Sequence, residues 1–259
     1  DFSYPSHSSG PEGFMGKGKQ QWQSETLVKL IRSLQPHILL NDRLDLPDEW
    51  DFLTPEQIDV PDEITVDGKP AVWEACHTFS GSWGYHRDQV FWKTTDMVVR
   101  MLIDIVSKNG NLLLNVGPTA RGELDSRAVE RLKEIGEWMD KHNRSIYGCK
   151  KAPDEFKSPE NCRLTFNPET NRLYIHIFAW PFGGYLRFEG FENRIEYAQL
   201  LNDASEIPIL HINNPSRLKR TQIGSVQDVQ DETQKIPAFL LPLQKPDACV
   251  PVIEVFLKK

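Results

Sequence analysis

The sequence predicts an α/β region at residues 1–148 followed by an all-β region at residues 149–259. In the first region, helical periods alternate with short apolar strands and no hairpin turn joins them, as in parallel β/α units. Residues 111–117 read Asn-Leu-Leu-Leu-Asn-Val-Gly, the near-continuous apolar run of a strand buried on both faces. After Gly148, short strands are separated by turn residues such as those at 167–171, which predicts an antiparallel β-sandwich.

The elements of the first region follow from the spacing of apolar residues, because a recurrence every three or four positions gives a helix one buried face. Helices are expected at residues 22–33, 95–107 and 126–141. Strands are expected at residues 37–41, 70–76 and 111–117, and the region has about four candidate strands in all. Asn109-Gly110 ends the second helix, as such pairs commonly do.

The second region contains short β-prone runs with turns between them. They lie at residues 163–166, 172–178, 185–188, 195–201, 208–212, 238–241 and 250–257. Lys150, Lys151, Pro153 and Asp154 read as a linker, which places the domain boundary between residues 148 and 149.

Composition excludes several classes of protein. The 259 residues are 39% hydrophobic, carry a net charge of −7, and contain neither a basic stretch nor an apolar run near the roughly 18 residues of a membrane span. We therefore expect no nucleic-acid partner and no membrane span. The four cysteines are too scattered for a disulfide scaffold, and the seven histidines lack metal-ligand spacing, so no metal site is expected. Of the seven histidines, only His86 lies near the aromatic residues Trp83 and Tyr85, so it alone is kept as a candidate functional residue.

Carboxylates beside aromatic residues recur in the first region. Asp1 lies near Phe2 and Tyr4, Trp50-Asp51-Phe52 precedes Thr54-Pro55-Glu56, and Trp73 adjoins Glu74. Sugar sites combine these residue types, because two carboxyl groups cleave a glycosidic bond while aromatic rings pack against pyranose faces. One such pair alone is more typical of a core aromatic beside a surface carboxylate. Three clusters within 74 residues weaken that interpretation but do not by themselves decide for a sugar site.

Several of these segments, taken together, resemble the later half of the catalytic domain of family 29 α-L-fucosidases. The resemblance covers residues 1–148 in order, and its most specific block is Ser107–Pro118. The other segments that carry it are Asp1-Phe2-Ser3-Tyr4-Pro5, Asn41-Asp42-Arg43, Trp50-Asp51-Phe52, Thr54-Pro55-Glu56, Trp73-Glu74, Ser82-Trp83-Gly84-Tyr85 and Ile146-Tyr147-Gly148.

The resemblance implies the second half of a (β/α)8-like (TIM-type) barrel followed by the β-sandwich. It makes Asp1 the nucleophile of a retaining α-L-fucosidase and Glu56 the acid/base, with Glu74 as the rival acid/base. It also implies that Arg43 contacts fucose and that Trp83 packs against the C5 methyl group. The alternatives are a surface ion pair of Arg43 with Asp42 or Asp45, and ordinary core packing of Trp83.

The resemblance also implies that no cofactor is needed and that the partners are fucosylated glycans or fucosides. The protein is expected to be extracytoplasmic, in a secreted, periplasmic or lysosomal location, and an oligomer stays open. Because the region before the nucleophile is absent, we expect a fragment that is inactive without the missing N-terminal half. The alternatives are a non-hydrolytic fucose-binding or glycan-binding protein on the same scaffold, and a structural piece whose sandwich mediates assembly.

Overall fold

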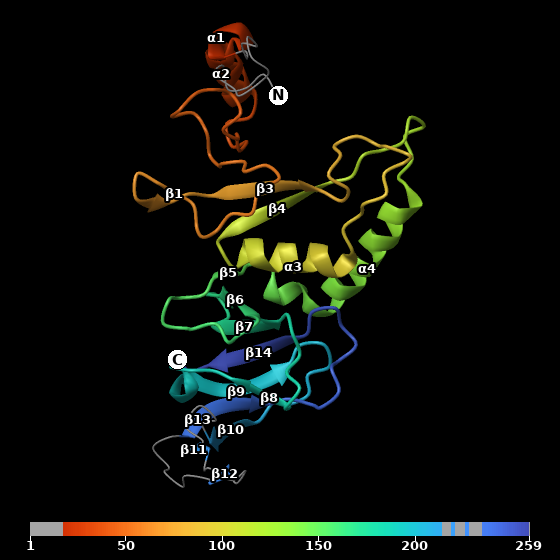
Figure 1. The fold of residues 1–259 in the computed structure, drawn as a ribbon. Helices are drawn as coiled ribbons and strands as arrows, with labels where there is room; N and C mark the ends of the chain where they lie inside the picture. Colours follow the sequence, from red (N-terminus) through yellow and green to blue (C-terminus); the bar gives the residue numbers. More distant parts are fainter. Residues whose placement is uncertain (1–17, 214–218, 221–225, 228–234, 259) are drawn as a thin grey trace. The chain divides into compact units, whose positions relative to one another are not determined.

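The structure is a computed structural model that describes residues 18–213, 219–220, 226–227 and 235–258 (Figure 1). The chain divides into two compact units. The first comprises Asp1–Trp92 and Lys108–Leu124, and the second comprises Lys93–Ser107 and Asp125–Lys259. The domain boundary between residues 148 and 149 stays a prediction.

The described part of the first unit begins with two consecutive helices, α1 (Lys19–Trp22) and α2 (Ser24–Leu34). The sequence predicts one helix here, and the break lies at Gln23, whose backbone is left-handed with φ 52°. On α2, Val28 is buried in a small cluster with Leu40 and Leu46. This cluster fixes the apolar face of the helix against the segment that follows it.

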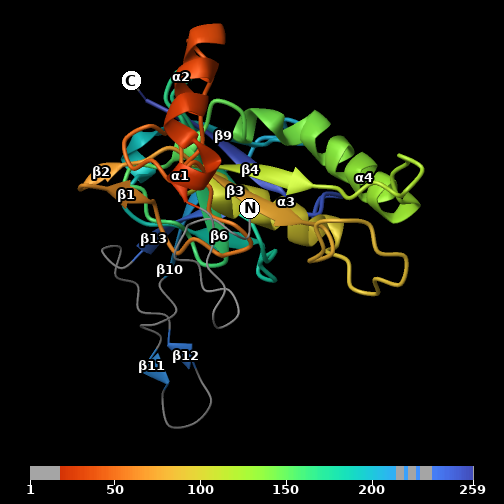
Figure 2. The ribbon, with the colours of Figure 1, turned by 90° about the horizontal axis from the view of Figure 1, so that it is seen from above.

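Parallel pairing organises the rest of the first unit. After the short hairpin of β1 (Thr65–Val66) and β2 (Lys69–Pro70), strand β3 (Trp73–Thr78) pairs in parallel with β4 (Gly110–Asn115), and the two lie side by side in Figures 1 and 2. Isolated parallel bridges extend this order backwards along the chain. They join Asn41 to Phe52, Leu53 to Trp73 and Glu56 to Cys76.

The strand expected at residues 37–41 is not regular, because side chains occupy backbone groups that a ladder would use. The guanidinium of Arg32 donates to the carbonyl of Ile38, and the amide of Leu40 donates to Asp51 Oδ2 at 2.7 Å. Only the bridge at Asn41 remains. That part of the prediction was wrong.

Trp73 and Gly110 form the closest contact between β3 and β4. The two residues are register partners, and the indole of Trp73 is fully buried. A Cβ atom on Gly110 would lie 2.4 Å from the indole ring, a distance that real contacts do not reach. The ring therefore requires a glycine at this position.

The second unit consists of two helices and most of the strands. Its elements are α3 (Thr95–Val106), α4 (Ser126–His142), η1 (Asn143–Ser145), β5 (Lys150–Lys151), β6 (Cys162–Asn167), β7 (Arg172–Ile177), β8 (Tyr185–Arg187), η2 (Glu192–Arg194), β9 (Ile195–Leu200), β10 (Ile209–Asn213), β11 (Lys219–Arg220), β12 (Val226–Gln227), β13 (Lys235–Leu240) and β14 (Val252–Leu257). Every strand pairing among the described residues of this unit is antiparallel, as the sequence predicts for the β region.

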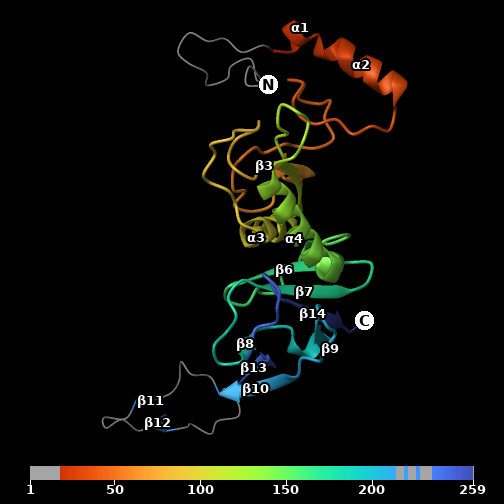
Figure 3. The same ribbon diagram turned by 90° about the vertical axis from the view of Figure 1, so that its right-hand side faces the viewer.

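The main core of this unit lies between two of its sheets. One has the order β5-β6-β7-β14-β9, and Figure 3 shows β6, β7, β14 and β9 in that succession. The other has the order β10-β13-β8. Side chains of both sheets share one buried cluster, to which Ile175 of β7, Leu186 of β8 and Phe239 of β13 belong.

The other face of the five-stranded sheet is covered by α3 and α4. Val99 and Ile103 of α3 and Trp138 of α4 form a second cluster with Tyr174 of β7 and Val252 of β14. β7 is therefore buried on both faces, and all of its residues from Leu173 to Ile177 are buried.

Candidate active site

Parallel register gathers the candidate carboxylates on one face of the first unit. Glu56 pairs with Cys76 across the ladder. Thr54 lies two positions before Glu56, and side chains alternate along a strand, so both point to the same face. Glu74 lies two positions before Cys76, so all four side chains share this face, which we call the candidate face. Glu74 in turn pairs with Asn111 of β4.

The opposite face of β3 is its core face, since Trp73, Ala75 and His77 are buried there. On the candidate face, Glu74 and Cys76 are half-buried. β3 thus presents one apolar face to the core and one polar, accessible face, where chemistry on a ligand can take place.

Arg43 and Glu56, which lie 13 positions apart, form an ion pair. The Arg43 guanidinium donates to Glu56 Oε2 at 2.6 Å, and both side chains are about one-third exposed. A second contact fixes the start of this segment, because the backbone amide of Arg43 donates to Asn41 Oδ1 at 3.2 Å. The ion pair that the structure shows for Arg43 is therefore with a candidate catalytic carboxylate.

Thr54 links Arg43 to Asp42. Its hydroxyl accepts from Arg43 Nε at 2.8 Å and donates to Asp42 Oδ1 at 2.6 Å, while its backbone amide donates to the same oxygen at 3.1 Å. The carbonyl of Thr54 also accepts from the Arg43 guanidinium at 3.2 Å. Sequence reasoning noted Thr54 only through its spacing from Glu56 and missed this positioning role.

Glu74 differs from Glu56 in its surroundings. Within the described part of the chain, its carboxylate makes no hydrogen bond or ion pair. Burial raises the pKa of the neighbouring Cys76 thiol, and the charges of Glu56 and Glu74 raise it further, while Arg43 opposes them. Both carboxylates therefore lie close enough to Cys76 for their charges to affect the pKa of its thiol.

Trp83 lies in the loop after β3 and is partly exposed. Its backbone carbonyl accepts from Asn115 Nδ2 at 2.8 Å, and Gly117 packs against the same loop, where an added Cβ would lie 2.6 Å from the backbone of Gly84. Asn115 therefore holds the Trp83 loop, and Asn111 makes a similar contact, donating to the Trp73 carbonyl at 3.2 Å.

The remaining candidates are placed as follows. Asp1, the expected nucleophile, lies outside the described residues. His86 is exposed and lines a small cavity together with Tyr85 and Trp92. Among the residues that the structure describes, no group of three or more His, Cys, Asp or Glu side chains could hold a metal ion.

Comparison with known proteins decides the family. The sequence profile described as Alpha-L-fucosidase matches residues 4–144, which is more than half of the chain. The chain belongs to the α-L-fucosidase family. The plasma α-L-fucosidases of Rattus norvegicus and Homo sapiens are 33% and 32% identical to it over 122 residues, or 45% of this chain.

The solved structure of α-L-fucosidase isoenzyme 1 from Paenibacillus thiaminolyticus covers 95% of this chain with a TM-score of 0.80 and 35% identity. The chain spans about a quarter of the length of the curated family members, and the match covers 56% of the Paenibacillus chain. No helix among the described residues has the length and apolar character needed to cross a bilayer.

Proposed function

We propose that the protein is an α-L-fucosidase that hydrolyses terminal α-L-fucosides with retention of configuration. The observation that carries the proposal is the candidate face: within the segment that matches the family, two carboxylates and an arginine meet on adjoining parallel segments. Glycoside hydrolysis with retention needs two carboxyl groups and no metal or organic cofactor.

In the proposed reaction, the Asp1 carboxylate attacks the anomeric carbon while a carboxyl group on the candidate face protonates the departing glycosidic oxygen. The C–O bond to the aglycone breaks and a fucosyl ester forms on Asp1. Water then attacks the same carbon, the candidate-face carboxylate takes the proton of that water, and Asp1 leaves. Atoms and charge balance over the two displacements.

We assign the acid/base role to Glu56 and keep Glu74 as the alternative. The bond to Arg43 supports Glu56, because it fixes the direction of the carboxylate and places a cation beside the substrate. The half-buried carboxylate of Glu74, which has no ion-pair partner among the residues that the structure describes, supports the alternative. We also propose that Arg43 contacts the fucose hydroxyl groups and that Trp83 packs against the C5 methyl group of fucose.

At the level of the fold, we propose that residues 1–148 are the later half of a (β/α)8-like barrel and that residues 149–259 form a β-sandwich. In the first unit, segments that follow one another in the sequence pair in parallel, and this supports the first proposal. The core shared by the two antiparallel sheets supports the second. In such barrels, catalytic groups come from the carboxyl ends of the strands and the loops after them.

The test is the release of 4-nitrophenol from its α-L-fucoside. It is measured for the 259-residue chain and for a version in which the coding sequence upstream of Asp1 is included. We expect activity in the longer version, none in the chain alone, and a loss of at least about 10³-fold for Asp1→Asn. Azide should restore turnover to Glu56→Gln and not to Glu74→Gln if Glu56 is the acid/base; the reverse pattern would transfer the role to Glu74.

The second candidate function is a non-hydrolytic glycan-binding protein on the same scaffold. Fucose binding by the longer version without any release of 4-nitrophenol would establish it and overturn the hydrolase proposal. We further propose fucosylated glycans as partners and an extracytoplasmic location. The names of the plasma α-L-fucosidases support both.

A further inference from the structure

A tight turn in the second unit holds an aromatic side chain in solvent. Gly184 donates its amide to the carbonyl of Pro181 at 3.3 Å and has a φ of +72°, a conformation that suits glycine. The Gly184 carbonyl is bonded to the amide of Leu241 at 2.7 Å, which ties the turn to the three-stranded sheet. Phe182 stands on this turn and is fully exposed.

Trp180 lies just before the turn and is anchored. Its indole N–H donates to the carbonyl of Pro242 at 3.1 Å, and the ring is partly buried against the main core. Trp180 therefore offers a rigid ring beside an exposed one.

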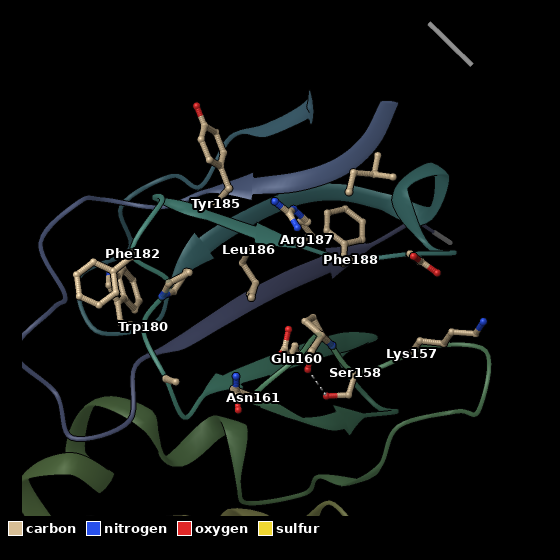
Figure 4. Close-up of a pocket in the computed structure, with 15 residues that line it drawn as sticks. Lys157, Ser158, Glu160, Asn161, Trp180, Phe182, Tyr185, Leu186, Arg187 and Phe188 are labelled. Carbon is tan, nitrogen blue, oxygen red and sulfur yellow. Dashed lines mark hydrogen bonds between the residues drawn. The ribbon is translucent and has the colours of Figure 1, made fainter. Parts of the chain in front are cut away.

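The two rings border a cavity of about 700 Å³ that lies wholly within the second unit. One wall is the edge strand β8, from which Leu186 points toward the loop at residues 157–161 (Figure 4). The side chains of Glu160 and Asn161 rise from that loop toward β8 in the same view. The volume lies within the range of pockets that enclose small organic ligands.

The polar side chains that line this cavity include as many cations as anions. Two cations, Lys157 and Arg187, face two anions, Glu160 and Glu189. Within the described part of the chain, none of these four side chains has a hydrogen-bond or ion-pair partner, and neither has the Asn161 amide group. Such a lining offers both donors and acceptors without a net field, which disfavours a polyanion.

We propose that this cavity binds a neutral oligosaccharide. Pyranose rings present apolar faces to the rings of Trp180 and Phe182, while their hydroxyl groups exchange hydrogen bonds with charged and amide side chains. The site lies on the β region and is independent of the candidate face, so its occupancy does not depend on the proposed hydrolysis.

An extended peptide added to β8 is the competing occupant. The bonds to β13 use Gly184 and Phe188, so by alternation the backbone groups of Tyr185 and Arg187 point to the open edge. β8 is only three residues long, which leaves little ladder for a peptide. The aromatic pair and the uncommitted polar groups favour the saccharide.

The test is calorimetric titration of the full chain with a panel of neutral, fucose-free trisaccharides: cellotriose, chitotriose, mannotriose and xylotriose. At least one should bind, and Phe182→Ala should weaken that binding about tenfold. Because Phe182 is fully exposed, this variant should fold normally. Trp180→Ala should weaken binding at least as much, with an unchanged far-UV spectrum as the check on folding.

The matched control is Tyr147→Ala, since Tyr147 is an exposed aromatic of the same unit that does not line the cavity. It should leave binding unchanged, and so should Arg43→Ala in the first unit. The proposal is overturned if no trisaccharide binds, if binding is unaffected by Phe182→Ala and Trp180→Ala, or if only a β-strand peptide binds and protects the Tyr185 and Arg187 amides from exchange. If the longer version fails to cleave fucosides while the trisaccharide still binds, the proposed function alone is refuted.

Discussion

Thr54 is the residue through which Asp42 positions Arg43. One hydroxyl group can donate only one proton, and here it goes to Asp42, so the same oxygen must accept from Arg43 Nε. The direction of each hydrogen bond is therefore fixed. A side chain without the hydroxyl would lose both contacts at once.

We expect Thr54→Val to lower kcat/KM for the fucoside about tenfold in the longer version, because Arg43 loses an acceptor and Asp42 loses a donor. Thr54→Ser keeps the hydroxyl and should retain most of the activity. Steady-state kinetics across pH would check this, with the melting temperature as the control. An equal loss in both variants, or an unchanged pH–rate profile in Thr54→Val, would contradict the positioning role.

The site residues differ in how far sequence could predict them. The spacing of Thr54 and Glu56 places both on one face of a strand, and this part of the site follows from alternation alone. The contact of Arg43 with Glu56 does not, because it depends on how the chain turns at Asn41 and returns 13 residues later. A charged pair of this kind has no local pattern.

At the scale of elements, β3 and β4 depend on a glycine. The indole of Trp73 occupies the space where any other residue at position 110 would place its Cβ. We expect Gly110→Ala to lower the free energy of unfolding by about 1–3 kcal/mol through overpacking. Urea titration would measure it.

Gly136 in α4 provides the matched control, since an added Cβ there meets nothing within 4 Å. Gly136→Ala should instead stabilise the protein, by up to about 1 kcal/mol, through helix propensity. Destabilisation of equal size in both variants would show that the Trp73 contact is not the cause. Trp73→Phe should relieve part of the effect of Gly110→Ala.

Helices were the elements that sequence predicted best. The apolar stripes of α3 and α4 are long and periodic, and both helices begin at a side-chain cap, Thr94 for α3 and Asp125 for α4. Residues 37–41 read as an apolar strand, yet Arg32 and Asp51 take two of their backbone groups. The sequence of these five residues does not show that side chains from other parts of the chain will bond to their backbone groups. The cavity beside Trp180 could not be predicted either, because its walls come from segments about twenty residues apart in the sequence.

At the scale of the whole molecule, two buried histidines make stability depend on pH. The Thr165 hydroxyl donates to the Ser145 carbonyl, so it must accept from His176 Nε2, which leaves His176 Nδ1 without a proton or a partner among the described residues. His142 Nδ1 donates to the Trp138 carbonyl and leaves Nε2 in the same condition. Both imidazole rings are therefore neutral, and each has one unprotonated nitrogen in an apolar setting.

Burial and, to a smaller extent, the neighbouring His142 lower the pKa of His176 to about 3. Burial also lowers the pKa of His142. The unfolded chain therefore binds these protons more readily than the folded one. The free energy of unfolding is therefore highest above about pH 6.5. As the pH drops from there toward 3, His176 lowers it by about 1.4 kcal/mol per pH unit.

Urea unfolding at pH 7, 6 and 5 would measure this slope. His176→Leu should flatten it, whereas His211→Leu, at an exposed position, should not. An unchanged slope in His176→Leu would assign the acid sensitivity to other groups. The hydrogen bonds that Asp125 accepts from Arg127 lower its pKa to about 2. Asp125 therefore loses its contribution to the free energy of unfolding only at a more acidic pH.

The cluster that joins α3 to the last strand has a consequence for biosynthesis. Val106 leaves the ribosome about 150 residues before Val252, the strand residue with which it shares a core. At about 5–20 residues per second, α3 waits on the order of ten seconds or more for that partner. During this interval the apolar stripe of α3 lacks its final cover, so it stays exposed on the nascent chain until the segment that holds Val252 has been synthesised.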